Sequence, residues 1–141
     1  MVRIMAIDYG DARTGVAISD ATGLIAGFTT VIQQRNRTAV AEAVAALMRQ
    51  HQVEEVVLGF PRNMDGTEGP RAALYRAFAA LLEEQTGQKP ILWDERRTSI
   101  DAHQILHANG RKEKAHRKNV DAVAASLILE GYLAFRRNQQ R

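Results

Sequence analysis

The stretch that decides the fold is RIMAIDYGDARTGVAISD, residues 3–20. Its beginning, residues 3–9, is a short apolar run, which predicts a buried strand with Asp8 at its C-terminal end. Residues 9–15 are rich in turn-forming types, and residues 16–20 form a second apolar run. Because so short a connection joins the two runs, we expect them to pair as an antiparallel hairpin.

Outward from this hairpin, the spacing of the apolar residues alternates between strand and helix periods. In chain order it predicts a strand at 24–32, a helix at 38–50, a strand at 53–60, a helix at about 71–84, a strand at 90–95, a short helix from 98 or 99 to 107, and a last helix at about 119–135. Gly87 is expected to end the second of these helices. We expect residues 111–118 to form a basic loop, and Leu74 and Phe135 to face inward on their helices.

These elements predict an α/β fold with a five-stranded mixed sheet, and 141 residues fit one domain, residues 1–141. Strands that follow helical crossovers should lie parallel to the first strand. Asp8, the loop that begins at Gly59, and Glu95 would then meet at one edge of the sheet. Ligands of such sheets bind beyond the C-terminal ends of the strands.

Composition excludes several classes of protein. Hydrophobic residues make up 45% and charged residues 25% of the chain, which is typical of a globular protein and not of a disordered or fibrous one. The absence of cysteine excludes a disulfide scaffold, a cysteine-ligated metal and a cysteine nucleophile. No apolar run approaches the length of a membrane span, and we see no signal peptide, so we expect a cytoplasmic protein without a membrane partner.

Charge is unevenly distributed along the chain. Residues 1–95 hold 9 Lys/Arg and 12 Asp/Glu, whereas residues 96–141 hold 10 and 4. This asymmetry indicates that the C-terminal third meets a polyanion. Solvated helix faces and a basic tail would explain the same counts.

Three carboxylates suggest chemistry at the predicted sheet edge. Asp8 and Glu95 end strands, and Asp121 lies in the first turn of the last predicted helix. Hard oxygen ligands of this kind suit Mg²⁺ or Mn²⁺, and such a site can act on a phosphodiester. The alternative is that Asp8 begins a turn, Glu95 is solvated and Asp121 interacts with the helix dipole.

The motifs at these positions resemble those of one family. In chain order they are IDYG with GVAISD (residues 7–10 and 15–20), GFPRNMDGTEG (59–69), DERRTS (94–99) and KNVDAVAA (118–125). They resemble the four motifs of the YqgF family, also called RuvX, the Holliday-junction-resolvase-like or pre-16S rRNA nuclease family. The resemblance implies a ribonuclease-H-like fold, with helices on both faces of the sheet. It also implies a metal-dependent phosphodiesterase centre at Asp8, Glu95 and Asp121.

The resemblance also implies a substrate. It predicts a nuclease that uses Mg²⁺ or Mn²⁺ to activate a water for attack on structured RNA, at the 5′ end of precursor 16S ribosomal RNA in pre-ribosomal particles. Alternatives are a Holliday-junction-resolvase-like endonuclease on branched DNA and a non-catalytic nucleic-acid-binding domain. A resolvase should act as a two-fold dimer, and the sequence is compatible with a monomer or a homodimer. Asp8-Tyr9-Gly10 also resembles the first phosphate loop of actin-like ATPases and sugar kinases, but those enzymes need two such domains.

Basic residues close to the acids are expected to position the nucleic-acid strand; they are Arg96, Lys114, Arg117 and Lys118. Resolvases of the RuvC type carry a further acid where this chain has Lys118, so the resemblance favours the YqgF proteins over true resolvases. Three acids leave the number of metal ions, one or two, open. The loop at 63–69 precedes a helix and would either hold a phosphate or form a flexible connection.

Overall fold

The computed structural model describes residues 2–23, 26–61, 68–94 and 113–139, and for residues 113–120 it describes the backbone alone. The elements are β1 (Ile4–Asp8), β2 (Thr14–Ser19), β3 (Ala26–Ile32), α1 (Arg37–His51), β4 (Glu55–Phe60), α2 (Arg71–Thr86), β5 (Ile91–Asp94) and α4 (Glu113–Gln139). The predicted strands and the first two long helices are confirmed to within a few residues. The short helix predicted at 98–107 lies outside the described residues.

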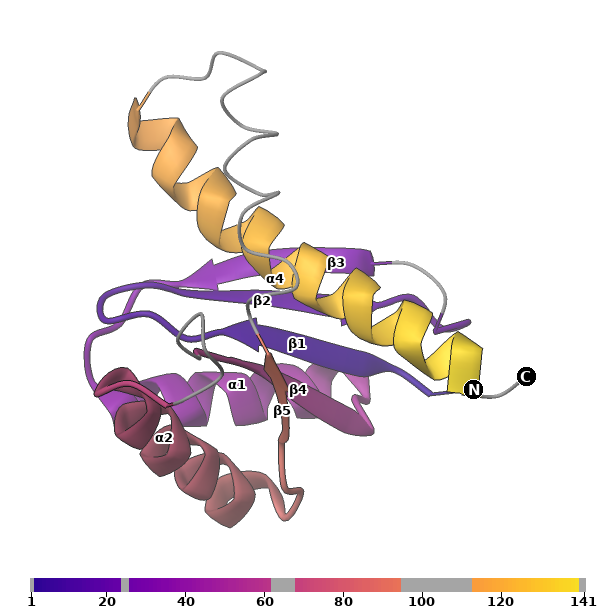
Figure 1. Cartoon of the computed structure of the whole chain (residues 1–141), viewed down its shortest axis with the longest axis horizontal. Coiled ribbons are helices and arrows are strands. Elements are labelled where there is room, and N and C mark those ends of the chain that lie inside the picture. Colours follow the sequence, from indigo (N-terminus) through magenta and orange to yellow (C-terminus); the bar gives the residue numbers. More distant parts are fainter. Residues whose placement is uncertain (1, 24–25, 62–67, 95–112, 140–141) are drawn as a thin grey trace.

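The five strands form one mixed sheet in the order β3-β2-β1-β4-β5 (Figure 1). β1 pairs antiparallel with β2 and parallel with β4, and β4 pairs parallel with β5, as the connections predicted. In this register Ile7 lies opposite Leu58, and Phe60 lies opposite Asp94. The C-terminal ends of β1, β4 and β5 therefore share one edge of the sheet, and Asp8 stands in its middle.

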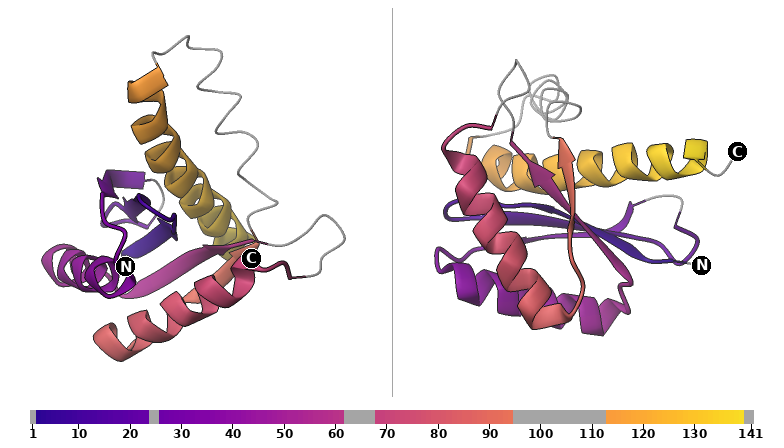
Figure 2. Two further views of the ribbon diagram at one scale, coloured as in Figure 1. Left: turned by 90° about the vertical axis from the view of Figure 1, so that its left-hand side faces the viewer. Right: turned by 60° about the horizontal axis from the view of Figure 1, so that its bottom comes forward.

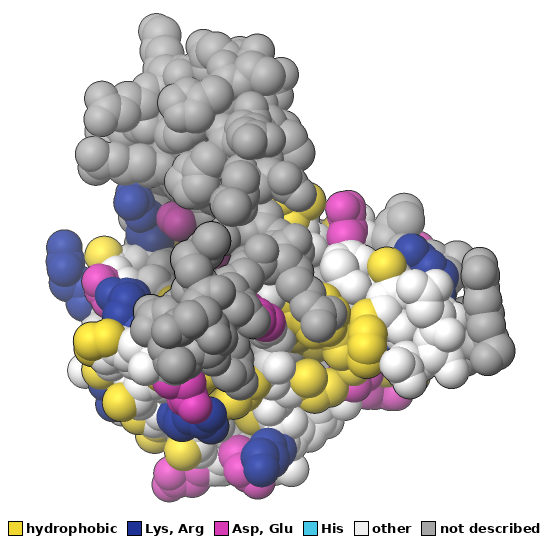
Figure 3. Space-filling view, viewed as in Figure 1, with side chains coloured by type: hydrophobic (Ala, Val, Ile, Leu, Met, Phe, Trp, Pro, Cys, Tyr) yellow, Lys and Arg dark blue, Asp and Glu magenta, His cyan; other side chains and the backbone are white. Residues whose placement is uncertain are grey.

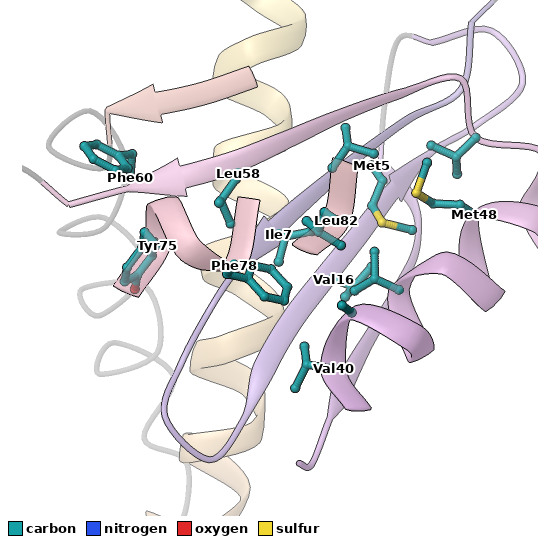
Figure 4. Close-up of a cluster of buried hydrophobic side chains, with 14 of the residues drawn as sticks. Met5, Ile7, Val16, Val40, Met48, Leu58, Phe60, Tyr75, Phe78 and Leu82 are labelled. Atoms are coloured by element: carbon teal, nitrogen blue, oxygen red, sulfur yellow. The ribbon is translucent and has the colours of Figure 1, made fainter. Parts of the chain in front are cut away.

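Helices cover both faces of the sheet (Figure 2). Because side chains alternate along a strand, Met5 and Ile7 of β1 face α1 and α2, whereas Ile4 and Ala6 face α4. The larger core lies under α1 and α2, with Phe78 fully buried against the sheet (Figure 4). Gly87 ends α2 in the left-handed conformation, with φ 75°, as expected.

The face under α4 includes small residues of the sheet beside larger ones. Ala6 and Ala17 are fully buried there, together with Ala125 of the helix. Small side chains on both surfaces let the helix axis approach the strands closely. Within the described residues, no helix is both long enough and apolar enough to cross a membrane.

The expected basic loop is wrong over most of its length, because α4 already begins at Glu113. Residues 113–118 contain neither glycine nor proline and consist largely of good helix formers, so the helix extends in the N-terminal direction. Two expected inward positions are also wrong: Leu74 and Phe135 are each 41% exposed. α2 instead buries the row through Tyr75 and Phe78, which is turned away from Leu74.

The inward face of α4 is turned away from Phe135. Its buried residues are Ala124, Ala125, Ile128, Leu129, Tyr132 and Leu133. Phe135 lies beside them at the rim, with its ring centroid 5.6 Å from that of Trp93. Trp93 itself is buried in this core.

Candidate functional site

Asp8 is the last residue of β1 and lies in register with Gly15 of β2. The strand is buried up to Ile7, and Asp8 is half-buried where the sheet ends. Its position follows from the apolar run before it, because a run of this length must stay in the core until the first polar residue reaches the edge. Asp8 is therefore fixed by the central strand of the fold.

Asp121 reaches the same edge because α4 crosses β2 at Gly15. A side-chain carbon built on Gly15 would overlap the backbone carbonyl oxygen of Asp121 and would lie 3.4 Å from Cβ of Ala125. Only glycine permits this approach of helix and strand. Since Gly15 is the register partner of Asp8, the crossing brings Asp121 beside the end of β1.

The Asp121 carboxylate is held mainly by charge. Its side chain is 21% exposed, and Nε of Arg13 lies 3.2 Å from its Oδ2. This oxygen is buried, yet it accepts no hydrogen bond of good geometry from the described residues. The two observations agree when the arginine is close enough for an ion pair but is not aligned for a hydrogen bond.

The electrostatics link the two acids. Burial raises the pKa of Asp121 above its ordinary value, the positive charge of Arg13 opposes this rise, and the negative charge of Asp8 adds to it. A divalent cation would offset both effects that disfavour the ionised Asp121, namely its burial and the negative charge of Asp8. Two carboxylates at a sheet edge, one with a buried oxygen lacking a hydrogen bond, are a donor set that fits a hard cation such as Mg²⁺ or Mn²⁺.

The third predicted acid, Glu95, lies outside the described residues, and so does Arg96. Glu95 follows Asp94, which ends β5 at the same sheet edge. Among the described residues alone, no group of three acids or histidines is close enough to hold a metal ion. Within the described residues, the site therefore contains Asp8 and Asp121. Arg13 pairs with Asp121 and would compete with a cation for this carboxylate.

The other predicted basic residues lie on α4. Lys114, Arg117 and Lys118 occupy its first two turns, and Lys118 stands one turn before Asp121, as expected. On a helix, positions three and four residues apart share a face. The backbone of α4 therefore places these three positions on the face that carries Asp121.

Sequence reasoning missed Arg13. It stands in the turn after β1, where the sequence pattern indicates only a turn-rich stretch. Its role depends on an aspartate from the other end of the chain. The available signal was modest: a basic residue in the loop directly after a strand that ends in a carboxylate.

The turn that carries Arg13 is anchored to α2. Tyr9 stacks on Phe78 with ring centroids 4.1 Å apart, and the Tyr75 hydroxyl donates to the Tyr9 carbonyl at 2.5 Å. Two nitrogens of Arg71 donate to the carboxylate of Asp11 at 3.2 and 3.3 Å. These contacts hold the segment between Asp8 and Arg13 in place.

The loop at 63–69, considered as a phosphate site, lies largely outside the described residues. At its end, Glu68 accepts two hydrogen bonds from Arg76 of α2, at 2.9 and 3.0 Å. Helix α2 then begins after Pro70, which makes no side-chain capping bond. Phosphate binding by this loop stays a prediction.

The chain matches the model of a known protein family. The model of the family described as "RuvX: Holliday junction resolvase" matches residues 2–135. Several relatives carry the name "Putative pre-16S rRNA nuclease". The one from Carboxydothermus hydrogenoformans is 41% identical over 135 residues, which cover 96% of this chain and 98% of the relative. That from Moorella thermoacetica is 42% identical over 132 residues and covers 94% of each chain.

Solved structures give a likeness in fold. The chain superposes on RuvC of T. thermophilus, solved in complex with a Holliday junction substrate, with a TM-score of 0.62. The match covers 98% of this chain and 97% of RuvC, at 12% sequence identity. A second Thermus thermophilus RuvC structure matches with a TM-score of 0.58, also at 12% identity. These likenesses confirm the expected ribonuclease-H-like fold.

Proposed function

Since this chain belongs to the RuvX family, we propose that it is a metal-dependent nuclease that hydrolyses phosphodiester bonds in structured RNA. The observation that carries the proposal is the pair of carboxylates, Asp8 and Asp121, brought to one sheet edge by the contact of α4 with Gly15. The substrate we propose is the 5′ end of precursor 16S ribosomal RNA, which is supported by the name of the relatives. Such a substrate places the activity in the cytoplasm, with residues 1–141 acting as one domain.

In this proposal Asp8, Glu95 and Asp121 hold Mg²⁺ or Mn²⁺. When bound, such an ion supplies Lewis-acid stabilisation for the charge on the phosphodiester. The backbone contact at Gly15 orients Asp121, and the end of the central strand orients Asp8. Preorganised carboxylates of this kind need little rearrangement during the reaction.

Basic residues hold the substrate around this centre. Lys118 offsets the negative charge of the scissile phosphate, while Arg96, Lys114 and Arg117 contact the flanking backbone. Contacts of this type are made to phosphates and carry no base sequence, so recognition depends on the shape of the RNA.

A second candidate is an endonuclease that cuts branched DNA, which is favoured by the description of the matching family. Lysine at position 118, where an acid would be needed for resolvase-like chemistry, favours the RNA nuclease. A symmetric junction also demands two copies of the protein. The mass in solution therefore helps to separate the two candidates.

The test is incubation with Mn²⁺ of three substrates in parallel: precursor ribosomal RNA, single-stranded RNA and a four-way DNA junction. We expect cleavage of the precursor by the wild type and none by Asp121→Asn. Cleavage of the junction alone would support the second candidate. Binding of RNA without cleavage by the wild type would indicate a non-catalytic nucleic-acid-binding domain.

A further inference from the structure

A polar groove lies beside Arg13, where the turn between β1 and β2 meets the segment from β3 to α1. It has a volume of about 670 Å³ and is lined by Ala12, Arg13, Gln33, Gln34, Arg35 and Asn36. The two segments meet because Thr14 of β2 pairs with Ile32 of β3, so Arg13 and Gln33 extend from neighbouring strand ends. We call these six residues the β2–β3 groove.

The lining of the β2–β3 groove is cationic and rich in amides. It contains two arginines, and none of its described lining residues is acidic. Asn36 is already engaged, because its side chain accepts a hydrogen bond from the backbone nitrogen of Ala39 at 3.0 Å and caps α1. Gln33, Gln34 and Arg35 are exposed to solvent.

This chemistry fits a phosphodiester backbone better than other ligands. Small-molecule sites of this size are mostly apolar and bury their ligand, whereas this groove is polar and open. Guanidinium groups match the geometry of phosphate oxygens, and glutamine amides also contact them.

The position of the groove relates it to the carboxylates. Arg13 both lines the groove and pairs with Asp121. In the sheet order, β2 and β3 lie on one side of β1, and β4 and β5 lie on the other. The groove therefore flanks Asp8 on the side opposite β5. Glu95 and Arg96 follow β5 in the sequence. Figure 3 shows basic side chains on the left-hand side of the molecule, over the region that holds the hairpin in Figure 1.

We propose that the β2–β3 groove binds the backbone of the nucleic-acid strand whose scissile phosphate lies at Asp8 and Asp121, with Arg35 contacting a phosphate away from the cut. The inference rests on the proposed nuclease function and extends it. The strand would pass from the β5 side of the sheet edge, across the two carboxylates and Arg13, into the groove. Substrates too short to reach Arg35 would lose this contact.

The experiment measures binding of fluorescently labelled single-stranded RNA by anisotropy, in EDTA, over a series of salt concentrations. Arg35→Gln removes one charge from the groove just before α1, and Arg49→Gln removes one from the exposed far end of α1 as a matched control. Gln34→Lys adds a charge to the groove. All three positions are exposed, so the fold should tolerate each change.

For a strand of about 16 nucleotides, we expect Arg35→Gln to reduce the slope of log affinity against log salt by about 0.7, the value for one phosphate contact to a single strand. At 0.1 M salt this corresponds to about 5-fold weaker binding. Gln34→Lys should change slope and affinity by similar amounts in the opposite direction, and Arg49→Gln should change neither.

Two results overturn the groove assignment while the nuclease proposal stands. One is an unchanged salt slope for both groove variants. The other is a reduction of the salt slope by Arg49→Gln that equals the reduction by Arg35→Gln. In either case the wild type would still bind and cut RNA. A wild type that binds no nucleic acid at all would overturn the proposed function, and the groove assignment with it.

Discussion

Gly15 of β2 and Asp121 of α4 are in backbone contact, and this contact places the second acid of the site beside the first. The strand contributes no side chain at this point, so the helix carbonyl occupies the space that any larger residue would need. Asp8 is the register partner of Gly15 on β1. One glycine thus determines how closely the N-terminal hairpin and the last helix approach each other.

Gly15→Ala is expected to destabilise the protein. The added carbon would overlap a backbone carbonyl, which yields less readily than a side chain, so we expect a loss of about 1–3 kcal/mol in the free energy of unfolding. Urea denaturation measures this loss. Gly27→Ala is the control, because its added carbon would lie 3.3 Å from Asp20 and needs only a small shift. Equal stabilities of the two variants would contradict the close crossing.

Asp8→Asn is expected to abolish cleavage and preserve the fold. The substitution keeps the shape of the side chain but removes the negative charge that a hard cation requires. We expect the single-turnover rate with Mn²⁺ to fall by about 100-fold or more, with an unchanged circular dichroism spectrum. Cleavage by this variant at the wild-type rate, with Mg²⁺ or Mn²⁺, would show that Asp8 is no part of the centre.

Arg13→Gln is expected to have opposite effects on stability and metal affinity. The guanidinium pairs with Asp121 when no metal is bound, and it repels a divalent cation. Its loss should cost about 0.2–1 kcal/mol of stability in EDTA, because the pair is partly exposed, and should strengthen Mn²⁺ binding by up to about 5-fold. Thermal unfolding and calorimetric titration measure the two effects. Arg13→Lys keeps the charge and is the control. Weaker Mn²⁺ binding by Arg13→Gln would contradict the view that Arg13 repels the cation.

Asp121 is expected to make stability depend on pH in metal-free buffer. Burial raises its pKa above the ordinary value of 3.8, so the folded chain binds this proton more tightly than the unfolded chain does. As the pH rises from 3.8 through the raised pKa, the wild type therefore loses stability relative to Asp121→Asn, and the difference then stays constant. Urea unfolding at a series of pH values measures this difference. A difference that does not change across the window would be inconsistent with a buried, ionised Asp121.

Lys118→Asp is expected to strengthen metal binding and to slow the cleavage of RNA. Position 118 lies one helical turn before Asp121, so an aspartate there adds a hard ligand to the same face of α4. The substitution also removes a positive charge from the scissile phosphate. Mn²⁺ titration and single-turnover cleavage measure the two effects. If both quantities stay at their wild-type values, Lys118 has no role at the site.

Much of the architecture could be predicted from local patterns. The apolar runs that end at Asp8 and Asp94 gave the right strands, and short or helical connections gave the right strand directions. The start of α4 was missed, because the run of lysines and arginines looked like a solvated loop. In a long helix the neighbouring turns stabilise such residues, which have good helix propensity of their own.

The sequence by itself determined the strands, the first two long helices and the carboxylate that ends the central strand, because these properties depend on neighbours along the chain. Only the tertiary structure decided the rotation of α4, which turns Phe135 outward, and the pairing of Arg13 with Asp121. Both follow from the packing of α4 on β2 at Gly15. Contact between surfaces from opposite ends of the chain depends on the shape of each surface, and the periodicity of either segment alone does not encode that shape.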